Sequence, residues 1–241
     1  MENINYKSEL KKIYPYRIEM HAHTSPVSVC SEIPPEEMMR TYAEIGYDAI
    51  VITNHFTKSM FDGMTKNEAI DYYVKDYEDC TSLSEKYKVK VLLGAEIRFE
   101  SESMNDYLIY GVDRKILEDA YDYLSGDIKT YRENVKLDNS LFIQAHPFRA
   151  TPADPSLLDG VEAFNMHHHH NSRIALALRF AKKNNIKIIT PGSDFHHPDA
   201  QNEGNAAVRA KKIPKDSFEL AQILKTGDYI IDLGPDTILL P

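Results

Sequence analysis

Histidines and carboxylates stand at the ends of several predicted strands in this 241-residue chain. Seven of these residues have side chains that suit divalent transition metals: His21, His23, His55, Glu96, His146, Asp194 and His196. In a barrel of parallel strands, the carboxyl ends of all strands meet at one face, where active sites lie. We therefore expect the seven residues to converge on one metal centre, although they are far apart in the sequence.

The spacing within two pairs supports this interpretation. His21 and His23 are two residues apart, so they point to the same side of a strand, and Asp194 and His196 do the same if their strand continues. Neutral imidazoles and carboxylates suit Zn²⁺, Mn²⁺ or Fe²⁺, and a carboxylate such as Glu96 can bridge two ions. A single His-x-His pair is weak evidence, but ligand types at five separate strand ends make a chance arrangement improbable.

Short apolar runs alternate with amphipathic segments along the chain, which predicts an α/β fold with a parallel sheet. The predicted strands cover residues 17–21, 48–55, 89–99, 106–112, 141–148, 160–165, 186–194 and 228–233. The predicted helices cover residues 34–45, 65–87, 115–124, 127–139, 172–184 and 214–226, and Thr65 with Glu68 predicts a capping box. About seven such units favour a closed barrel over an open sheet. No linker or repeat divides the chain, so we expect a single domain over residues 1–241.

The composition is that of a globular protein, with 42% hydrophobic residues. The 28 Lys and Arg residues against 37 Asp and Glu residues give a net charge of −9, which disfavours a broad surface for nucleic acids. Two cysteines, Cys30 and Cys80, make no disulfide framework and favour a reducing compartment. The N-terminus is polar, and no apolar run is long enough to cross a membrane. We therefore expect a cytoplasmic protein with no membrane partner.

Five motifs give the chain a specific resemblance to a known family. EMHAHTS, VITNHF, LLGAEI, QAHPFR and GSDFHH occur between residues 19 and 197, in the order in which the PHP (polymerase and histidinol phosphatase) superfamily places its motifs. The resemblance implies a distorted (β/α)7 TIM-like barrel that holds two or three divalent metal ions. It also implies how the seven residues divide: His21, His23, Glu96 and Asp194 hold one ion, Glu96 and His146 a second, and His55 and His196 a third.

The chain departs from the family pattern at two ligand positions. The family usually has an Asp or a His after the His-x-His motif, where the segment SPVSVCSEI offers Cys30 or Glu32. Cys30 is either a thiolate ligand for a soft or borderline metal or a small buried residue without a chemical role. The family also tends to have a His on the fourth strand, where this chain has Leu108. The second ion is therefore expected to lack one protein ligand.

Two other features lie near the expected site. The run from His167 to His170 follows the predicted strand 160–165. One of these histidines could reach the site, but four consecutive side chains cannot all point inward, and a solvated loop is the favoured interpretation. Arg149 follows the His-Pro-Phe of the fifth predicted strand, and at the mouth of a barrel its guanidinium can bind the oxygens of a phosphate.

Together these features predict a metal-dependent phosphoesterase that acts on a small phosphorylated substrate. Clustered divalent ions would activate a hydroxide and neutralise charge on the phosphoryl group. An amidohydrolase-type enzyme is one alternative, because it also uses His-x-His and a late Asp, but the spacing of Asp194 and His196 argues against it. A metal-binding regulatory domain without activity is another, and it would account for the altered positions at Cys30 and Leu108.

Overall fold

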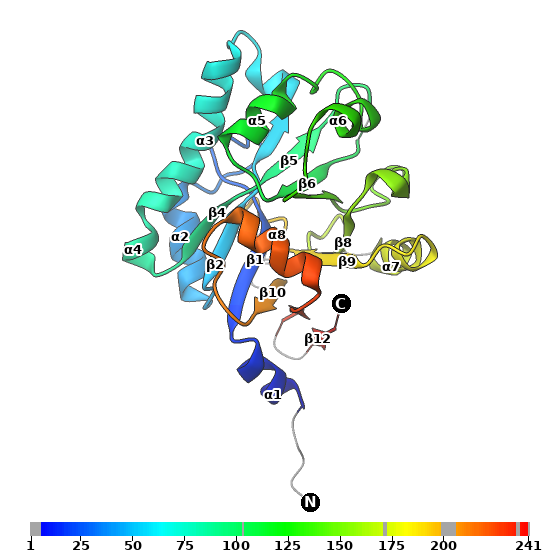
Figure 1. The fold of residues 1–241 in the computed structure, drawn as a ribbon. Coiled ribbons are helices and arrows are strands. Elements are labelled where there is room, and N and C mark those ends of the chain that lie inside the picture. Colours follow the sequence, from blue (N-terminus) through cyan, green and yellow to red (C-terminus); the bar gives the residue numbers. More distant parts are fainter. Residues whose placement is uncertain (1–5, 103, 171–172, 199–205, 235–236, 241) are drawn as a thin grey trace, which may run out of the picture.

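The computed structural model describes residues 6–240 apart from residues 103, 171–172, 199–205 and 235–236. In this part of the chain the strands form two mixed sheets of six strands each (Figure 1). In spatial order, the first sheet contains β12 (Ile238–Leu239), β11 (Ile230–Asp232), β10 (Ala207–Ala210), β1 (Tyr16–Ala22), β2 (Ala49–Ile52) and β4 (Lys90–Leu93). The second contains β3 (His55–Thr57), β5 (Ala95–Arg98), β6 (Tyr107–Tyr110), β7 (Leu141–Gln144), β8 (Gly160–Asn165) and β9 (Ile188–Gly192). The expected α/β class is confirmed.

The sheets are not wholly parallel, so this part of the prediction is wrong. The strands β1, β2 and β4 pair in parallel, as do β3 with β5 and β7 with β8 and β9. In contrast, β10 is antiparallel to β1 and β11, and β6 is antiparallel to β5 and β7. A loop without a helix joins β5 to β6, so the chain returns as a hairpin rather than as a crossover. As a result, the beginning of β6 lies beside the ends of β5 and β7.

The two sheets adjoin because short segments of chain pass from one to the other. Gly94 alone separates β4 from β5, and Thr53 and Asn54 separate β2 from β3. Elsewhere, the N–H of Asp194 donates to the carbonyl of His21 over 2.8 Å, so the segment that follows β9 lies against the end of β1. The strand pairing describes two sheets, and closure into a (β/α)7 barrel remains a prediction.

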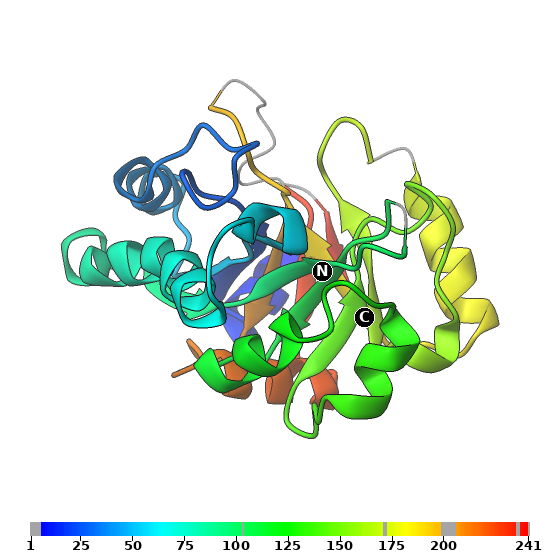
Figure 2. The same ribbon diagram turned by 90° about the horizontal axis from the view of Figure 1, so that it is seen from above.

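Helices surround the strands (Figures 1 and 2). On one flank lie α2 (Pro35–Glu44), α3 (Lys66–Ser82) and α4 (Ser84–Tyr87), and on others lie α5 (Arg114–Tyr121), α6 (Ile128–Asn134), α7 (Ile174–Lys183) and α8 (Ser217–Thr226). Two short 3₁₀ helices are η1 (Lys58–Phe61) and η2 (Pro155–Leu157). Fully buried aromatic and aliphatic side chains, such as Phe56, Tyr107 and Phe142, fill the space between helices and strands.

Most predicted elements are present, with small shifts at their ends. The predicted strand 160–165 coincides with β8, and the predicted capping box of Thr65 and Glu68 begins α3. The predicted strand 89–99 is divided at Gly94, where a Cβ would lie only 2.7 Å from the side chain of Val51. The predicted helix 172–184 corresponds to α7, and its first residue, Ser172, lies outside the described residues. Neither α1 (Tyr6–Ile13) nor β10 was predicted.

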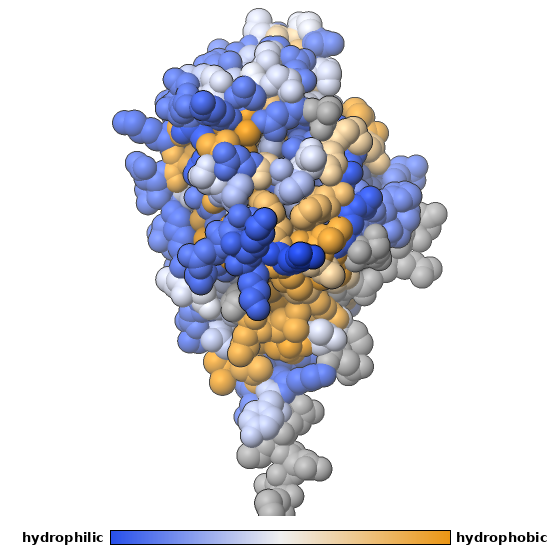
Figure 3. All heavy atoms as spheres, turned by 90° about the vertical axis from the view of Figure 1, so that its right-hand side faces the viewer, coloured by the Kyte–Doolittle hydropathy of each residue, from blue (hydrophilic) through white to orange (hydrophobic). Residues whose placement is uncertain are grey.

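The face with α7 and the C-terminal strand carries a continuous apolar area between hydrophilic side chains (Figure 3). Leu176 and Leu240 are among the large apolar side chains that are exposed. Among the described residues, none of the helices combines the length and the apolar character needed to span a membrane.

Candidate metal centre

All seven predicted residues come together where the two sheets adjoin. A cavity of about 610 Å³ opens there, and five of the seven line its wall: His55, Glu96, His146, Asp194 and His196. His21 and His23, near the end of β1, are fully buried and contact Glu96 and Asp194. The structure therefore brings these residues together as predicted. Their roles as metal ligands remain predictions.

Four of the residues form a compact donor group. The Nε2 atoms of His21 and His23 lie 2.9 Å apart. His21 Nε2 lies 3.5 Å from Glu96 Oε1 and from Asp194 Oδ1. His23 Nε2 lies 3.4 Å from Glu96 Oε2 and from Asp194 Oδ1. Ligand atoms at tetrahedral Zn²⁺ are separated by about 3.3 Å when each bond is about 2.0 Å long. Both imidazole nitrogens lie at about this separation from each carboxylate, so the four side chains are candidate ligands of a single divalent ion.

A second donor group combines Glu96 and His146 with Asp106, which was not predicted. Glu96 Oε1 lies 3.0 Å from His146 Nε2, and Asp106 Oδ2 lies 3.7 Å from the same nitrogen. The prediction that Leu108 leaves this group one donor short is therefore wrong. Leu108 belongs to the buried core, and Asp106, two residues earlier, faces Glu96 and His146. The physical reason is the antiparallel direction of β6, because its beginning, rather than its end, reaches the site.

Asp106 also binds two arginines at the rim of the cavity. Arg98 donates from Nε and Nη2 to the two carboxylate oxygens over 2.6 and 2.8 Å. Arg149 donates from Nη1 to Oδ2 over 2.6 Å. Both guanidiniums line the cavity, and the side chain of Arg149 is 27% exposed. Arg149 therefore lies where the sequence placed it, and its role in substrate binding remains a prediction.

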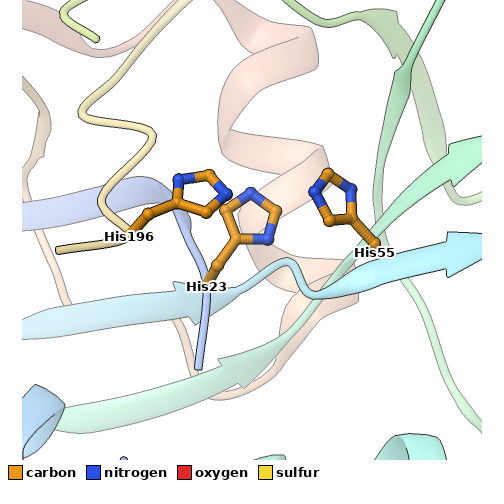
Figure 4. A group of neighbouring side chains, drawn as sticks. All are labelled: His23, His55 and His196. Carbon is orange, nitrogen blue, oxygen red and sulfur yellow. The ribbon is translucent and has the colours of Figure 1, made fainter. Parts of the chain in front are cut away.

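A third donor group consists of three histidines from different segments (Figure 4). His23 lies between the other two, with its ring centroid 4.1 Å from that of His196 and 4.5 Å from that of His55. Cys30 lines the same cavity as His55 and His196, and its thiol interacts with both imidazoles. Glu32, the other residue considered at this position, instead faces His197 at 3.6 Å and is largely exposed.

The histidine run is partly a solvated loop and partly a wall of the cavity. His168 and His169 are exposed, which fits the favoured interpretation. His170 is half-buried and belongs to a donor group with His146 and Asp194, and its Nε2 lies 4.0 Å from Asp194 Oδ2. One histidine of the run therefore reaches the site.

Glu162 positions His21, and sequence reasoning missed it. His21 Nδ1 lies 2.8 Å from Glu162 Oε1, which leaves Nε2 facing the four-residue donor group. The other oxygen of Glu162 accepts hydrogen bonds from the His146 N–H and from Asn165 Nδ2, each over 2.9 Å. Gly192 leaves room for this contact, because a Cβ there would lie 2.1 Å from Glu162 Oε1. A charged residue inside the apolar strand VEAFN was the signal that could have revealed it.

The charges of the centre stabilise one another in a buried environment. Burial alone lowers the pKa of His21, but the carboxylates of Glu162, Asp194 and Glu96 raise this pKa well above its usual value. Burial raises the pKa of Glu96, and His55 and His21 more than reverse this, so that the pKa lies well below the usual range. Burial also raises the pKa of the Cys30 thiol, but His196 and His55 lower it to about 6.

Two observations indicate that the centre is built for a ligand. Glu96 Oε2 and His55 Nδ1 face each other at 2.7 Å, yet neither makes a hydrogen bond to any described residue. Backbone strain coincides with the site, since His146 and Asp194 have positive φ angles of 25° and 53°. Such conformations are uncommon for residues other than glycine and cluster at functional sites. The two atoms without a hydrogen bond and the uncommon backbone conformations are both typical of a ligand site.

The sequence of residues 19–177 matches the model of the PHP domain family. Because this match covers more than half of the chain, the chain belongs to the PHP domain family.

Individual relatives are distant. A PolC-type DNA polymerase III from Oceanobacillus iheyensis is 24% identical over 163 residues, which are 67% of this chain but only 10% of the polymerase. A two-domain protein from Bacteroides vulgatus, described as containing a predicted PHP-like metal-dependent phosphoesterase, has a TM-score of 0.61 at 14% identity, over 91% of this chain and 65% of that one. PsfC from Pseudomonas syringae has a TM-score of 0.50 at 12% identity, over 80% of both chains. The likeness to these solved structures shows a shared fold.

We expect the substitution Glu162→Gln to weaken metal binding at the four-residue donor group by about 10–100-fold, the usual cost of removing a partner that orients a ligand. The amide keeps the size of the side chain but removes the charge that holds His21. Metal affinity is measured by competition with a chromophoric chelator. Glu118→Gln, on the outer side of α5, is the matched control and should leave affinity unchanged. Equal affinities in both variants would show that other contacts hold His21.

Proposed function

We propose that this chain is a metal-dependent phosphoesterase that hydrolyses a small phosphomonoester with two or three divalent ions. The observation that carries the proposal is the convergence of buried imidazoles and carboxylates into donor groups that share members. Glu96 belongs to two of these groups, and His23 also belongs to two. Membership of the PHP domain family points to the same chemistry. Seven predicted ligands, with Asp106 and His170 added, exceed what one tetrahedral ion requires.

The ions and the residues of the chain have different roles in the proposed mechanism. When bound, ions such as Zn²⁺, Mn²⁺ or Fe²⁺ supply electrophilic activation of water and of phosphoryl oxygens. The residues of the chain hold these ions in fixed positions, with the two oxygens of Glu96 turned toward different imidazoles. Burial of these groups keeps bulk water from screening their charges, which strengthens electrostatic stabilisation of a transition state. At the rim, Arg149 can donate to phosphate oxygens that approach the ions.

The size and charge of the site favour a small substrate. A cavity of about 610 Å³ lies within the range typical of small-molecule sites. The net charge of −9 disfavours long contacts with a polynucleotide. The end of a nucleic-acid strand is nevertheless included as a competing substrate in the screen, because the match to a DNA polymerase covers 67% of this chain.

The proposal is tested by stripping the protein of metal and adding back Zn²⁺, Mn²⁺ or Fe²⁺ separately. Each form is then assayed with phosphomonoesters, oligonucleotide ends, amides and lactones. We expect two or three ions per chain by elemental analysis and hydrolysis of phosphomonoesters that a chelator abolishes. Full activity of metal-free protein would rule out the mechanism, and preference for amides or lactones would assign the centre to amidohydrolase-type chemistry. Tight metal retention with no hydrolysis would indicate a regulatory domain.

Asp194→Asn should lower kcat/KM for a phosphomonoester at least about a hundredfold, because the loss of a ligand should cost no less than the loss of a residue that orients one. The side chain keeps its shape but no longer supplies a charged ligand to the group with His21 and His23. Circular dichroism should show an intact fold. An active, folded Asp194→Asn variant would place the catalytic centre elsewhere.

Arg149→Ala should chiefly raise KM for a phosphomonoester, with metal content unchanged, because the guanidinium is proposed to bind substrate rather than metal. Arg132→Ala is the matched control, since Arg132 pairs with Asp159 in a similar ion pair away from the cavity. Loss of metal from the Arg149 variant would instead mean that Arg149 serves to hold Asp106 in place.

A further inference from the structure

The segment 24–33, here called the Cys30 loop, is bonded to all three histidine-bearing segments of the third donor group. Ser28 Oγ lies 3.1 Å from His23 Nδ1 and accepts the backbone N–H of His55 over 3.0 Å. Ser31 Oγ donates to the carbonyl of His23 over 2.8 Å and contacts the carbonyl of His196 at 3.3 Å. The loop is therefore fixed relative to each imidazole.

The other side of the loop is anchored in the core. Asp76, a buried residue of α3, accepts hydrogen bonds from Thr24 Oγ1 over 3.0 Å and from the N–H of Val27 over 3.1 Å. Asn54 Oδ1 accepts the N–H of Thr24 over 2.7 Å and the hydroxyl of Ser28 over 2.9 Å. These bonds fix the backbone before Cys30, and the bond from Ser31 to the carbonyl of His23 fixes it after Cys30, so the fold holds this residue in place before any ion binds.

Cys30 is presented to the cavity by this loop. Its thiol contacts the imidazoles of both His55 and His196, and all three residues line the same cavity. The residue is exposed, so reagents and ions can reach its sulfur. Cysteine and histidine together are the donor set of many zinc sites.

An independent feature indicates that a cation belongs at this end of the cavity. Glu96 is fully buried, and its Oε2 makes no hydrogen bond to a described residue. This oxygen faces His55 Nδ1 at 2.7 Å and His23 Nε2 at 3.4 Å. A buried carboxylate oxygen is costly unless a positive charge or a donor compensates it. Without metal, a protonated His55 compensates this oxygen, and a divalent ion among these imidazoles would take the place of that proton.

We propose that Cys30 is a thiolate ligand, with His55 and His196, of the ion at this end of the centre, and that this position selects Zn²⁺ over Mn²⁺. On binding, the sulfur–metal bond forms and the thiol proton passes to solvent. Thiolate and imidazole prefer softer ions, whereas carboxylates suit harder ones such as Mn²⁺. The opposite end, with Glu96, Asp106 and His146, has two carboxylates and one imidazole. The centre is therefore chemically asymmetric, with a thiolate end and a carboxylate end.

The inference rests on the metal centre of the proposed function but not on hydrolysis, so spectroscopy tests it separately. Full-length protein is stripped of metal and titrated with Co²⁺, a spectroscopic substitute for Zn²⁺. We expect a thiolate-to-cobalt charge-transfer band in the near ultraviolet. Cys30→Ser should lose this band, and Cys80→Ala, the control at the buried second cysteine, should keep it. Cys30→Asp should bind the same number of ions without the band and should shift the Zn²⁺ over Mn²⁺ preference at least about tenfold toward Mn²⁺.

A second measurement needs no variant. Metal-free protein is treated with iodoacetamide, and the modified cysteine is identified by mass spectrometry. Cys30 should react, and added Zn²⁺ should slow its alkylation at least about tenfold, since a metal-bound thiolate is a poorer nucleophile. Fully loaded Co²⁺ protein without the band, or alkylation of Cys30 that Zn²⁺ does not change, would overturn the inference. A cobalt band in a protein that hydrolyses no phosphoester would leave the inference standing and remove the proposed function.

Discussion

The centre depends on one buried carboxylate, Glu96, and on the imidazoles that surround it. This side chain is fully buried on β5, at the junction of the two sheets. Desolvation alone would favour its neutral form, yet His55 and His21 keep its pKa well below the usual range. The same carboxylate contacts His21, His23, His55 and His146. Any change that moves β5 would therefore disturb several donor groups at once.

The fold supports this arrangement with contacts that are themselves buried. Glu162 holds His21 from behind, Ser28 holds His23, and Asn54 and Asp76 hold the Cys30 loop. The positive φ angles at His146 and Asp194 place two candidate ligands in backbone conformations that nonglycine residues seldom adopt. Such conformations persist only where the surrounding structure holds them, and bound ions would offset their cost. Metal binding at these residues would therefore also stabilise the fold.

The donor types are distributed unevenly across the cavity. Imidazoles and a thiol gather around His55 and His196, whereas two carboxylates meet His146 at the other end. Arg98 and Arg149 stand beside the carboxylate end and neutralise Asp106. A phosphate that entered from the rim would meet these guanidiniums next to the harder donor set. The uneven distribution of donors would therefore set the direction from which the proposed phosphorylated substrate approaches the centre.

Local patterns in the sequence determined which residues could bind metal and which elements carry them. His-x-His on a strand, a carboxylate or histidine after each apolar run, and the order of the five motifs all depend on short-range spacing, which a sequence displays directly. The seven residues chosen in this way do meet at one place, and the predicted strand 160–165 coincides with β8. The α/β class followed from the same alternation of apolar runs.

The tertiary structure alone decided the direction of β6, and with it the residue that completes the second donor group. Leu108 was the expected gap because the family pattern tends to place a His at that position, whereas the antiparallel β6 brings Asp106, just before its beginning, to the site. Strand direction depends on how distant segments pair, and no local periodicity records it. Other contacts of the site also join residues that are far apart in the sequence. They include the contact of Glu162 with His21, the contact of His170, rather than of its neighbours in the histidine run, with Asp194, and the interactions of Cys30. Such contacts exist only once the chain has folded.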